Sequence, residues 1–388
     1  AGTPKTGVCK VHQNFSTFND GCNFNYGLDY GISKNYFIMD MNPGVTAEKT
    51  LYNKVMDYLT KPALVFGDWH DELTDVSAIS TKGHYSVLSM CSNLSFWAHV
   101  EVNQANLWTR KPTTGKTLNP DKYYVMIQAS DGDSMGFEGA LKPSGWQGYP
   151  VWLDEDRGTT PITWTCQPLS AELWPALTEY YVLTSTPNDT FCTGPSGVGY
   201  CQPSLMPNQV QFAAFEEPFL QLTGLQWVEQ WWGWSESLWT NIKSGAPSVK
   251  CFGHQGTAGG KNHWLDDGTP VAISDTSLWH PGLNPANPAN PYNISDPNNI
   301  VNHITAFAAT RKTPYFITIY DNPVHALLYS KQCQASLPAN YELVTVEDFM
   351  DMMDQAVHPK PWGTLLTYDD FETSFGNYST GGSYCTRS

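Results

Sequence analysis

The sequence has few basic side chains. Its 388 residues include 21 Lys and Arg against 37 Asp and Glu, which gives a formal net charge of −16 at pH 7. Proteins that bind nucleic acid or anionic membrane surfaces need clustered Lys and Arg. We therefore expect no nucleic-acid partner and no membrane partner, and a polyanionic substrate is disfavoured.

Long apolar runs and targeting segments are missing too. No stretch of 18 apolar residues could form a transmembrane helix, and the first residues, AGTPKTG, do not have the pattern of a secretory signal. We therefore interpret the sequence as the mature form of a soluble protein. Its length suits one large barrel or two ordinary domains.

The spacing of the nine cysteines excludes two common classes of site. No two of them form a C-x-x-C pair, so zinc-ribbon and thioredoxin-like sites are ruled out. Several lie in loop-like sequence, which is typical of oxidised extracellular proteins. The most local pairs, Cys9–Cys22 and Cys192–Cys201, are predicted to form disulfides. The odd count leaves at least one thiol unpaired, and Cys91, inside an apolar run, is the expected one.

Glycosylation sequons and aromatic residues are abundant. Five N-x-S/T sequons occur, at Asn14, Asn93, Asn188, Asn293 and Asn377. Together with the cysteines they predict a secreted, extracellular glycoprotein. The 15 Trp and 20 Tyr can fill a core, but exposed aromatic rings also stack on the faces of sugars.

Short apolar runs recur along the chain, and most of them end in polar residues. They cover residues 35–44, 62–72, 85–93, 123–133, 189–200, 248–253, 269–280 and 313–323. Helix-like segments are predicted over 46–61, 170–184 and 346–357. Buried strands that alternate with helices indicate an α/β protein with a parallel sheet, and eight or so strands predict a (β/α)8-like TIM barrel, distorted and with long loops.

We expect a single barrel domain over residues 1–388, with an N-terminal extension over about 1–34 and a C-terminal tail over about 360–388. The proline-rich stretch 281–299 is predicted to be a long loop. The working face of such a barrel lies at the carboxyl ends of its strands. Acidic and other polar residues follow the apolar runs there, although Asp and Asn also favour ordinary turns.

The stretch SDGDS, at 130–134, places Asp131 and Asp133 on either side of Gly132, directly after an apolar run. Glycine allows a sharp turn between the two carboxylates. Three interpretations remain open: a cation site, although the EF-hand spacing is absent; a plain turn; or a catalytic acid or base beside a sugar ligand.

A second acidic stretch, GDWHDEL, contains Asp68, His70, Asp71 and Glu72. A glutamate facing an aspartate across a barrel mouth would supply the two carboxylates of glycoside hydrolysis. One would protonate the leaving oxygen, and the other would activate water or attack the anomeric carbon. The alternative is the N-terminus of a helix, where acidic residues are favoured by the dipole.

The glycine-rich stretch GPSGVGYCQP, at 194–203, fits neither phosphate-loop spacing nor the G-x-S-x-G pattern of serine hydrolases. It resembles the signature of the GxGYxYP family. Gly197, Gly199, Tyr200 and Pro203 match this signature, whereas Gln202 stands where the family has Tyr. The SDGD, GDWHDE and NLS stretches are similar as well, so the resemblance spans roughly residues 60–360.

This resemblance implies a TIM-barrel-like fold and glycoside hydrolase activity, without specifying the glycan. The departure at Gln202 puts any role of a second aromatic residue there in doubt. Polar and aromatic residues that follow the apolar runs are the expected substrate-binding residues. They are Asp40, His70, Asn93, Tyr200, Trp232, Trp234, Asp275, Trp279, His280, Tyr320 and Asp321.

The sequence thus favours a secreted, monomeric glycoside hydrolase that acts on a polysaccharide. Asp131 or Asp133, paired with Glu72 or Asp68, would be catalytic, and the chemistry requires no metal or other cofactor. A metal-dependent polysaccharide deacetylase or a lyase is an alternative if Asp131, Asp133 and His70 converge, although the sequence has no H-x-x-x-H pair. A carbohydrate-binding barrel without catalysis is another.

Overall fold

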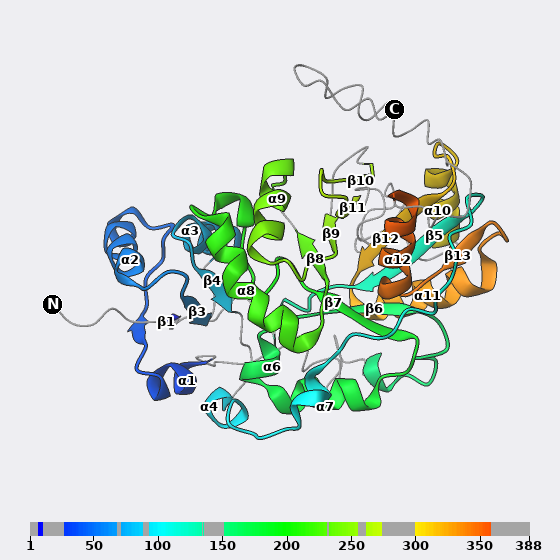
Figure 1. Cartoon of the computed structure of the whole chain (residues 1–388). Helices are drawn as coiled ribbons and strands as arrows, with labels where there is room; N and C mark the ends of the chain where they lie inside the picture. Colours follow the sequence, from blue (N-terminus) through cyan, green and yellow to red (C-terminus); the bar gives the residue numbers. More distant parts are fainter. Residues whose placement is uncertain are drawn as a thin grey trace, which may run out of the picture.

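A computed structural model gives the fold of the chain (Figure 1). It describes residues 7–10, 27–67, 71–87, 93–133, 135, 151–230, 233–254, 261–273 and 299–357. A parallel sheet with its helices lies at one side of the molecule, and α10, α11 and β13 lie at the other. The fold is mixed α/β, as expected, because strands that pair in parallel alternate with helices.

The first sheet has the order β2-β1-β3-β4, and all its strands are parallel. Its strands are β1 (Gly7–Lys10), β2 (Phe37–Met39), β3 (Leu64–Gly67) and β4 (Tyr85–Val87). The associated helices are α1 (Leu28–Ser33), α2 (Thr46–Tyr58), α3 (Glu72–Thr81) and α4 (Leu94–Trp97). Strand β1 lies inside the stretch predicted to be an N-terminal extension, and it pairs with β2 and β3.

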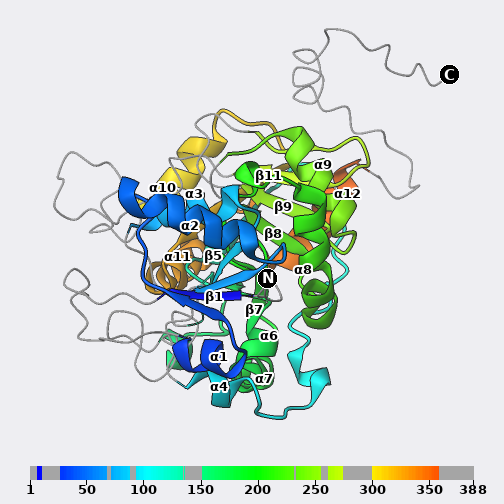
Figure 2. The same ribbon diagram turned by 90° about the vertical axis from the view of Figure 1, so that its left-hand side faces the viewer.

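Helices α2 and α1 attach to this sheet in different ways (Figure 2). Helix α2 buries Tyr52 and Met56 in a cluster with Val65 of β3. Helix α1 lies beside α4, where Asp29 accepts hydrogen bonds from the Ser95 backbone N–H (2.8 Å) and hydroxyl (2.5 Å). The helical spacing over 46–61 therefore predicted α2 correctly.

Two further sheets make up the rest of the chain. One has the order β12-β5-β6-β7, with β13 also paired to β5, and consists of β5 (Tyr123–Ala129), β6 (Ile162–Cys166), β7 (Asp189–Thr193), β12 (Tyr315–Asp321) and β13 (Tyr341–Leu343). The other has the order β10-β11-β9-β8 and consists of β8 (Trp227–Gln230), β9 (Cys251–His254), β10 (His263–Trp264) and β11 (Pro270–Ile273). Only the short β10 is antiparallel to its neighbour among these described strands.

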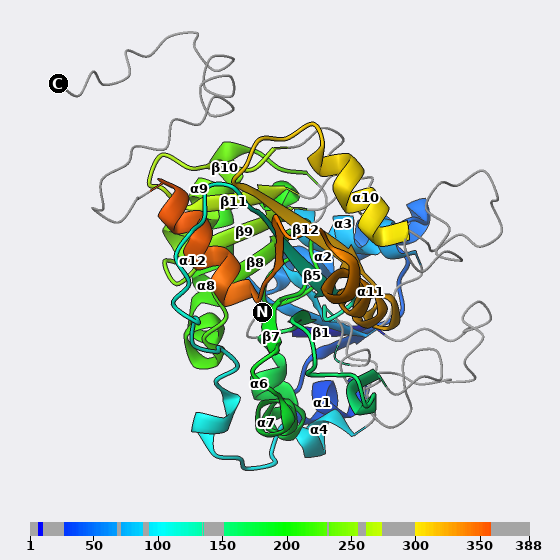
Figure 3. The same cartoon turned by 90° about the vertical axis from the view of Figure 1, so that its right-hand side faces the viewer.

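Helices connect and cover these strands. They are α6 (Ser170–Leu173), α7 (Pro175–Thr184), α8 (Gln209–Thr223), α9 (Glu236–Gly245), α10 (Asn299–Ala308), α11 (Pro323–Ser336) and α12 (Val346–Val357), with 3₁₀ turns η1 (Gln104–Leu107), η2 (Val151–Leu153) and η3 (Pro203–Leu205). Figure 3 shows helices α11 and α12 from the right-hand side of Figure 1. The predicted helix at 170–184 is divided into α6 and α7 at Pro175, which has no backbone N–H to donate.

Strand β5 is buried on both faces, which explains its continuous apolar sequence. On one face, Tyr124 and Met126 pack with Phe316 of β12, Trp227 of β8 and Phe349 of α12. The Phe349 ring lies 5.7 Å from Trp227 and 5.4 Å from Phe316, both edge-on. Burial of each such side chain contributes about 2–3 kcal/mol, so this aromatic cluster anchors α12 against the strands.

The expected closed eight-stranded barrel is not found in the described part of the chain. The predicted strands near 35–44, 62–72 and 85–93 are confirmed as β2, β3 and β4, but they form the separate first sheet. Apolar periodicity specifies a strand but not the neighbour with which it pairs, so the sequence could not exclude this arrangement. Strand β4 instead meets the chain after β7 through a bridge between Ser86 and Tyr200.

Side chains join the second and third sheets where backbone pairing is lacking in the described residues. At the β7–β8 seam, the Glu229 backbone N–H donates to the Thr193 hydroxyl (3.1 Å). At the β11–β12 seam, the Asn262 amide donates to the Phe316 carbonyl (2.6 Å) and its oxygen accepts from the Ile273 N–H (3.0 Å). The second and third sheets therefore contact each other at both seams.

The predicted Cys192–Cys201 disulfide is wrong, because both residues are buried free thiols. Cys192 points toward Gln128 of β5 (3.6 Å), while Cys201 lies over the backbone of Ser196 and Gly199. Cys192 lies in β7, whereas Cys201 lies in the loop that follows this strand, so the two thiols have different surroundings. The Cys9 side chain, Cys22 and Cys91 lie outside the described residues.

Within the described ranges, no helix is long and apolar enough to span a bilayer.

Candidate active site

The turn after β5 brings Asp131 and Asp133 to the carboxyl end of the sheet. Gly132 donates its backbone N–H to the Thr165 hydroxyl (2.9 Å), and a Cβ at Gly132 would lie 1.9 Å from the Thr165 carbonyl oxygen. Close approach to β6 therefore requires glycine here. The left-handed backbone conformation falls on Asp131 instead (φ 68°), a geometry that Asp tolerates better than most residues.

Asp133 is a buried carboxyl group at this turn, with its backbone fixed on two sides. The Gln167 amide donates to its carbonyl (2.9 Å), and Gly194 packs so closely that a Cβ there would lie 2.6 Å from the Asp133 nitrogen. Burial raises the pKa of Asp133 well above the usual range, and the carboxylates of Asp131 and Glu72 raise it further. The surroundings of Asp133 therefore favour its protonated form.

The N-terminus of α3 contributes the third carboxyl group, Glu72. The Asp71 side chain caps this helix by accepting the Thr74 backbone N–H (2.9 Å), so the helix begins at Glu72. The Tyr200 hydroxyl donates to Glu72 Oε1 (2.5 Å). Tyr200 itself is buried, and its pKa is raised by burial and then by Asp133 and Glu72.

A polar residue inside strand β8 was missed by the sequence analysis. Glu229 of β8 is fully buried, and its Oε2 accepts hydrogen bonds from Gln128 of β5 (2.9 Å) and from the Trp227 indole (2.8 Å). The available signal was the glutamate inside the apolar run LQWVEQWW. A carboxyl group in a buried strand is costly unless it has a hydrogen-bonding or charged partner. Glu229 therefore contacts strand β5 just before the Asp131–Asp133 turn.

Tyr320 lies among these carboxylates. Burial raises the pKa of its hydroxyl, and Asp131, Asp133 and Glu229 raise it further. The register of β12 on β5 pairs Tyr320 with Gln128, so both side chains occupy the same face of the sheet. The structure thus brings together the predicted residues Asp131, Asp133, Glu72, Tyr200 and Tyr320.

An aromatic group lies at the carboxyl ends of β8 and β9. Trp234, which is 39% exposed, stacks on the buried Trp239 with ring centroids 5.4 Å apart. His254, another residue that the sequence analysis missed, donates from Nδ1 to the Gln230 carbonyl (3.0 Å) and lies 6.0 Å from the Trp234 ring. Burial lowers the pKa of His254, so its imidazole is neutral at physiological pH.

Three predicted substrate-binding residues have other surroundings. The Asp321 carboxylate faces α11, where it accepts hydrogen bonds from the Tyr329 hydroxyl (3.0 Å) and the Asn322 N–H (2.7 Å). Asp40 is exposed after β2, and Asn93 is exposed before α4 with φ 60°. Asp321 is therefore a structural partner of α11, on the opposite face of β12 from Tyr320.

The remaining predictions concern residues outside the described ranges. These residues are Asp68, His70, Trp232, Asp275, Trp279 and His280. Among the residues that are described, no group of three His, Cys, Asp or Glu side chains could hold a metal ion.

Together, the fold and this group of residues define an α/β protein with acidic side chains gathered at the carboxyl ends of parallel strands. The chain belongs to the GxGYxYP family, since the family model described as "GxGYxYP putative glycoside hydrolase C-terminal domain" matches residues 121–354. The resemblance expected from Gly197, Gly199 and Tyr200 is thereby confirmed. No curated protein sequence matches the chain.

A solved structure with a TM-score above 0.7 shows a similar fold. A crystal structure of a putative hydrolase from Bacteroides thetaiotaomicron VPI-5482 superposes with a TM-score of 0.73 and 19% sequence identity, covering 91% of this chain and 67% of that chain. A mutant of the peptidoglycan deacetylase PdaC from Bacillus subtilis superposes with a TM-score of 0.35 and 12% identity, covering 63% of this chain and 100% of that chain.

Proposed function

We propose that this protein is a glycoside hydrolase that uses two of its own carboxyl groups to cleave a polysaccharide. The observation that carries the proposal is the buried Asp133 carboxyl group, held beside Asp131 and Glu72, which come from two distant segments of the chain. Glycoside hydrolysis needs one carboxylic acid that keeps its proton and one carboxylate nearby. Membership of a family described as putative glycoside hydrolases supports the same activity.

The geometry suggests a role for each group. Asp133 is the proton donor to the leaving oxygen, because its environment favours the protonated form. Glu72 is the carboxylate that activates water or attacks the anomeric carbon, since it is exposed and its Oε1 is fixed by Tyr200. Asp131, which accepts a hydrogen bond from the Ser130 hydroxyl, binds sugar hydroxyls.

We further propose that the second and third sheets act as an incomplete barrel. Strands β5, β6, β7, β8, β9, β11 and β12 follow one another in the chain and in the two sheets, with side-chain links at both seams. In barrels of this kind the active site lies at the carboxyl ends of the strands. That end is where Asp131, Asp133 and Tyr320 gather.

Charge near the candidate site is acidic, whereas both signs of charge occur at the amino ends of the strands. Basic residues lie a few positions before many strands, namely Lys61, Lys82, Lys122, Arg157, Lys250 and Arg311, and Lys82, Lys122 and Arg157 pair there with Asp57, Glu342 and Asp189. Carboxyl groups occupy the opposite ends of β5 and β8. The resulting negative potential at the site repels uronic acids and sulfated sugars. We therefore expect a neutral glycan, or one that carries amino groups, as substrate.

The decisive test is incubation with a panel of neutral, amino-bearing and uronic polysaccharides, followed by mass spectrometry of the soluble fragments. Asp133→Asn and Glu72→Gln should each lower the release of reducing ends at least about a thousandfold, because each removes one of the two groups required. Glu101→Gln, at an exposed position, is the matched control and should be fully active.

Three results would overturn the proposal. Full activity in both variants would exclude the assigned carboxyl groups. Release of acetate without new sugar ends would indicate a deacetylase, and binding of glycan without cleavage would indicate a carbohydrate-binding protein.

Secretion as a glycoprotein is also proposed, on the strength of the sequons. Asn93 is exposed and accessible to a glycan, whereas the Asn188 amide donates to the Gly158 carbonyl (2.8 Å) and is half-buried. Asn93 is therefore the better acceptor of these two. Peptide mapping of protein secreted by a eukaryotic host, before and after enzymatic removal of N-glycans, tests this, and an unmodified Asn93 would contradict it.

A further inference from the structure

We infer that Glu216 of helix α8 is a positioning residue for the candidate active site, holding the loop that carries Tyr200 against the end of β4. The inference deepens the proposed function, because the position of Tyr200 sets the position of Glu72. Glu216 lies outside every motif recognised in the sequence, and it does not touch the group of carboxyl groups described above.

The loop rests directly on the Glu216 carboxyl group. The Glu216 side chain is fully buried, and its Oε1 accepts a hydrogen bond from the Val198 backbone N–H (3.3 Å). Gly197 has φ 91°, and a Cβ at this position would lie 2.0 Å from Oε1. Only glycine allows this approach, which explains the first glycine of the GxGY signature.

The second glycine and the tyrosine continue the connection. A Cβ at Gly199 would lie 2.9 Å from the Ser86 carbonyl oxygen, so glycine lets the loop pack against β4. Ser86 and Tyr200 then exchange two backbone hydrogen bonds (2.8 and 3.2 Å). The Tyr200 hydroxyl ends the series at Glu72. A continuous set of contacts thus runs from Glu216 to a proposed catalytic carboxylate.

The surroundings of Glu216 disfavour its charged form. The titratable groups that face it are the hydroxyl of Tyr85 from β4 and the thiol of Cys201 from the loop. Burial raises the pKa of each, and the nearby Glu216 raises it further. Its second oxygen, Oε2, has no hydrogen-bond partner among the described residues. Burial accordingly raises the pKa of Glu216 well above its usual range. A protonated Oε2 with Oε1 as the acceptor matches this environment.

Hydrogen–deuterium exchange of the segment 194–203 tests the inference without any substrate. Glu216→Ala removes the support, and we expect this segment to exchange about tenfold faster than in the wild type. Glu216→Gln keeps an uncharged acceptor of the same shape and should exchange like the wild type. Arg157→Met is the control for general loss of stability, because it breaks an ion pair with Asp189 at the opposite end of β7. It should leave exchange in 194–203 unchanged.

The pH dependence of unfolding provides a second measurement. The folded protein keeps the Glu216 proton above pH 4.5, where the unfolded chain releases it, so wild-type stability falls as the pH rises toward the folded pKa. Glu216→Gln has no carboxyl group at this position and loses this pH dependence. Its melting temperature relative to that of the wild type should therefore rise as the pH is raised above about 4.5.

Two results would overturn the inference: wild-type exchange of segment 194–203 in Glu216→Ala, or a pH-independent difference between the wild type and Glu216→Gln. If a cleaved glycan is found, Glu216→Ala should lower kcat with little change in KM, and Glu216→Gln should restore it. A failure to find a cleaved glycan would count against the proposed function but not against the role of Glu216 in supporting the loop.

Discussion

The Tyr200 hydroxyl donates a 2.5 Å hydrogen bond to Glu72 Oε1, and this contact joins two residues separated by 128 positions. Glu72 begins a helix of the first sheet, whereas Tyr200 follows β7 of the second. The proposed active site therefore depends on how these two sheets dock. It is not a property of the strands from residue 121 onward alone.

Tyr200→Phe isolates this contact. We expect the free energy of unfolding to fall by no more than about 1.5 kcal/mol, which is typical for one hydrogen bond. Turnover should fall by roughly tenfold to a hundredfold, because Glu72 loses the donor that orients it. Tyr341→Phe, whose ring stacks on Tyr123 far from the site, is the control. Unchanged turnover in Tyr200→Phe would show that Glu72 needs no orientation.

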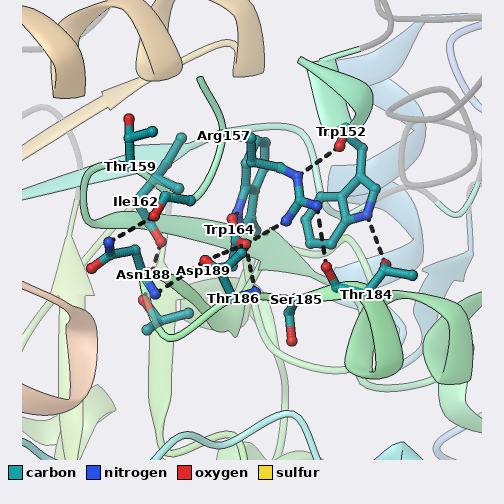
Figure 4. A network of polar contacts seen from close by, with 12 residues as sticks. Trp152, Arg157, Thr159, Ile162, Trp164, Thr184, Ser185, Thr186, Asn188 and Asp189 are labelled. Carbon is teal, nitrogen blue, oxygen red and sulfur yellow. Dashed lines mark hydrogen bonds and ion pairs between the residues drawn. The ribbon is translucent and has the colours of Figure 1, made fainter. Parts of the chain in front are cut away.

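A buried ion pair at the start of β7 stabilises the fold (Figure 4). Arg157 pairs with the fully buried Asp189, which also accepts hydrogen bonds from the Trp164 indole (3.0 Å) and from the backbone N–H of Thr186 (2.8 Å). Arg157→Met leaves a buried carboxylate without its counter-ion, and should cost about 3–5 kcal/mol in urea unfolding.

An exposed ion pair provides the comparison for this prediction. Lys331 pairs with Asp156, and both side chains are about two-fifths exposed. Lys331→Met should therefore cost less than about 1 kcal/mol, since exposed pairs are screened by solvent. Equal costs for the two variants would contradict the importance assigned to burial of Asp189.

The buried His84 makes the fold sensitive to acid. Its Nδ1 accepts the Ala63 N–H (3.1 Å) and its Nε2 donates to the Met56 carbonyl (2.9 Å), so it is neutral. Burial lowers the pKa of His84 from 6.5 to about 4. The unfolded chain thus binds a proton first as the pH falls, and stability is lost between pH of about 6.5 and about 4, by up to about 3 kcal/mol.

His84→Gln removes this titration. The free energy of unfolding of the variant, measured in urea across the same pH range, should fall less steeply than that of the wild type. The variant is expected to be less stable than the wild type at neutral pH, because Gln cannot replace both hydrogen bonds with the same geometry. Parallel pH profiles would contradict the assignment.

Trp234 is the exposed aromatic residue best placed to bind a sugar ring. Trp234→Ala should weaken binding of oligosaccharide roughly tenfold without loss of stability, because its ring is 39% exposed and stacked on Trp239. Trp108, which is 46% exposed and precedes β5, provides the matched control. Affinity electrophoresis of both variants distinguishes binding at Trp234 from a general loss of surface aromatics. Equal affinity in Trp234→Ala and the wild type would exclude this subsite.

Local pattern was enough to predict much of this protein. Each of the eight apolar runs contains a strand, and the continuous run over β5 fits its burial on both faces, whereas β1, β6, β8, β10 and β13 were not predicted. The acidic turn at 131–133 and the GxGY signature were also visible, because each is a short stretch with its own spacing. The family followed from that signature.

The sequence alone therefore determined the α/β class, eight of the described strands and the family, since these depend on residues close together in the chain. Tertiary structure alone decided that β2, β3 and β4 form a separate sheet, that Asp321 faces α11, and that Glu229 and Glu216 lie buried where no motif marks them. Pairing of strands and burial of carboxyl groups depend on contacts between segments tens to hundreds of residues apart. Periodicity carries no information about such contacts.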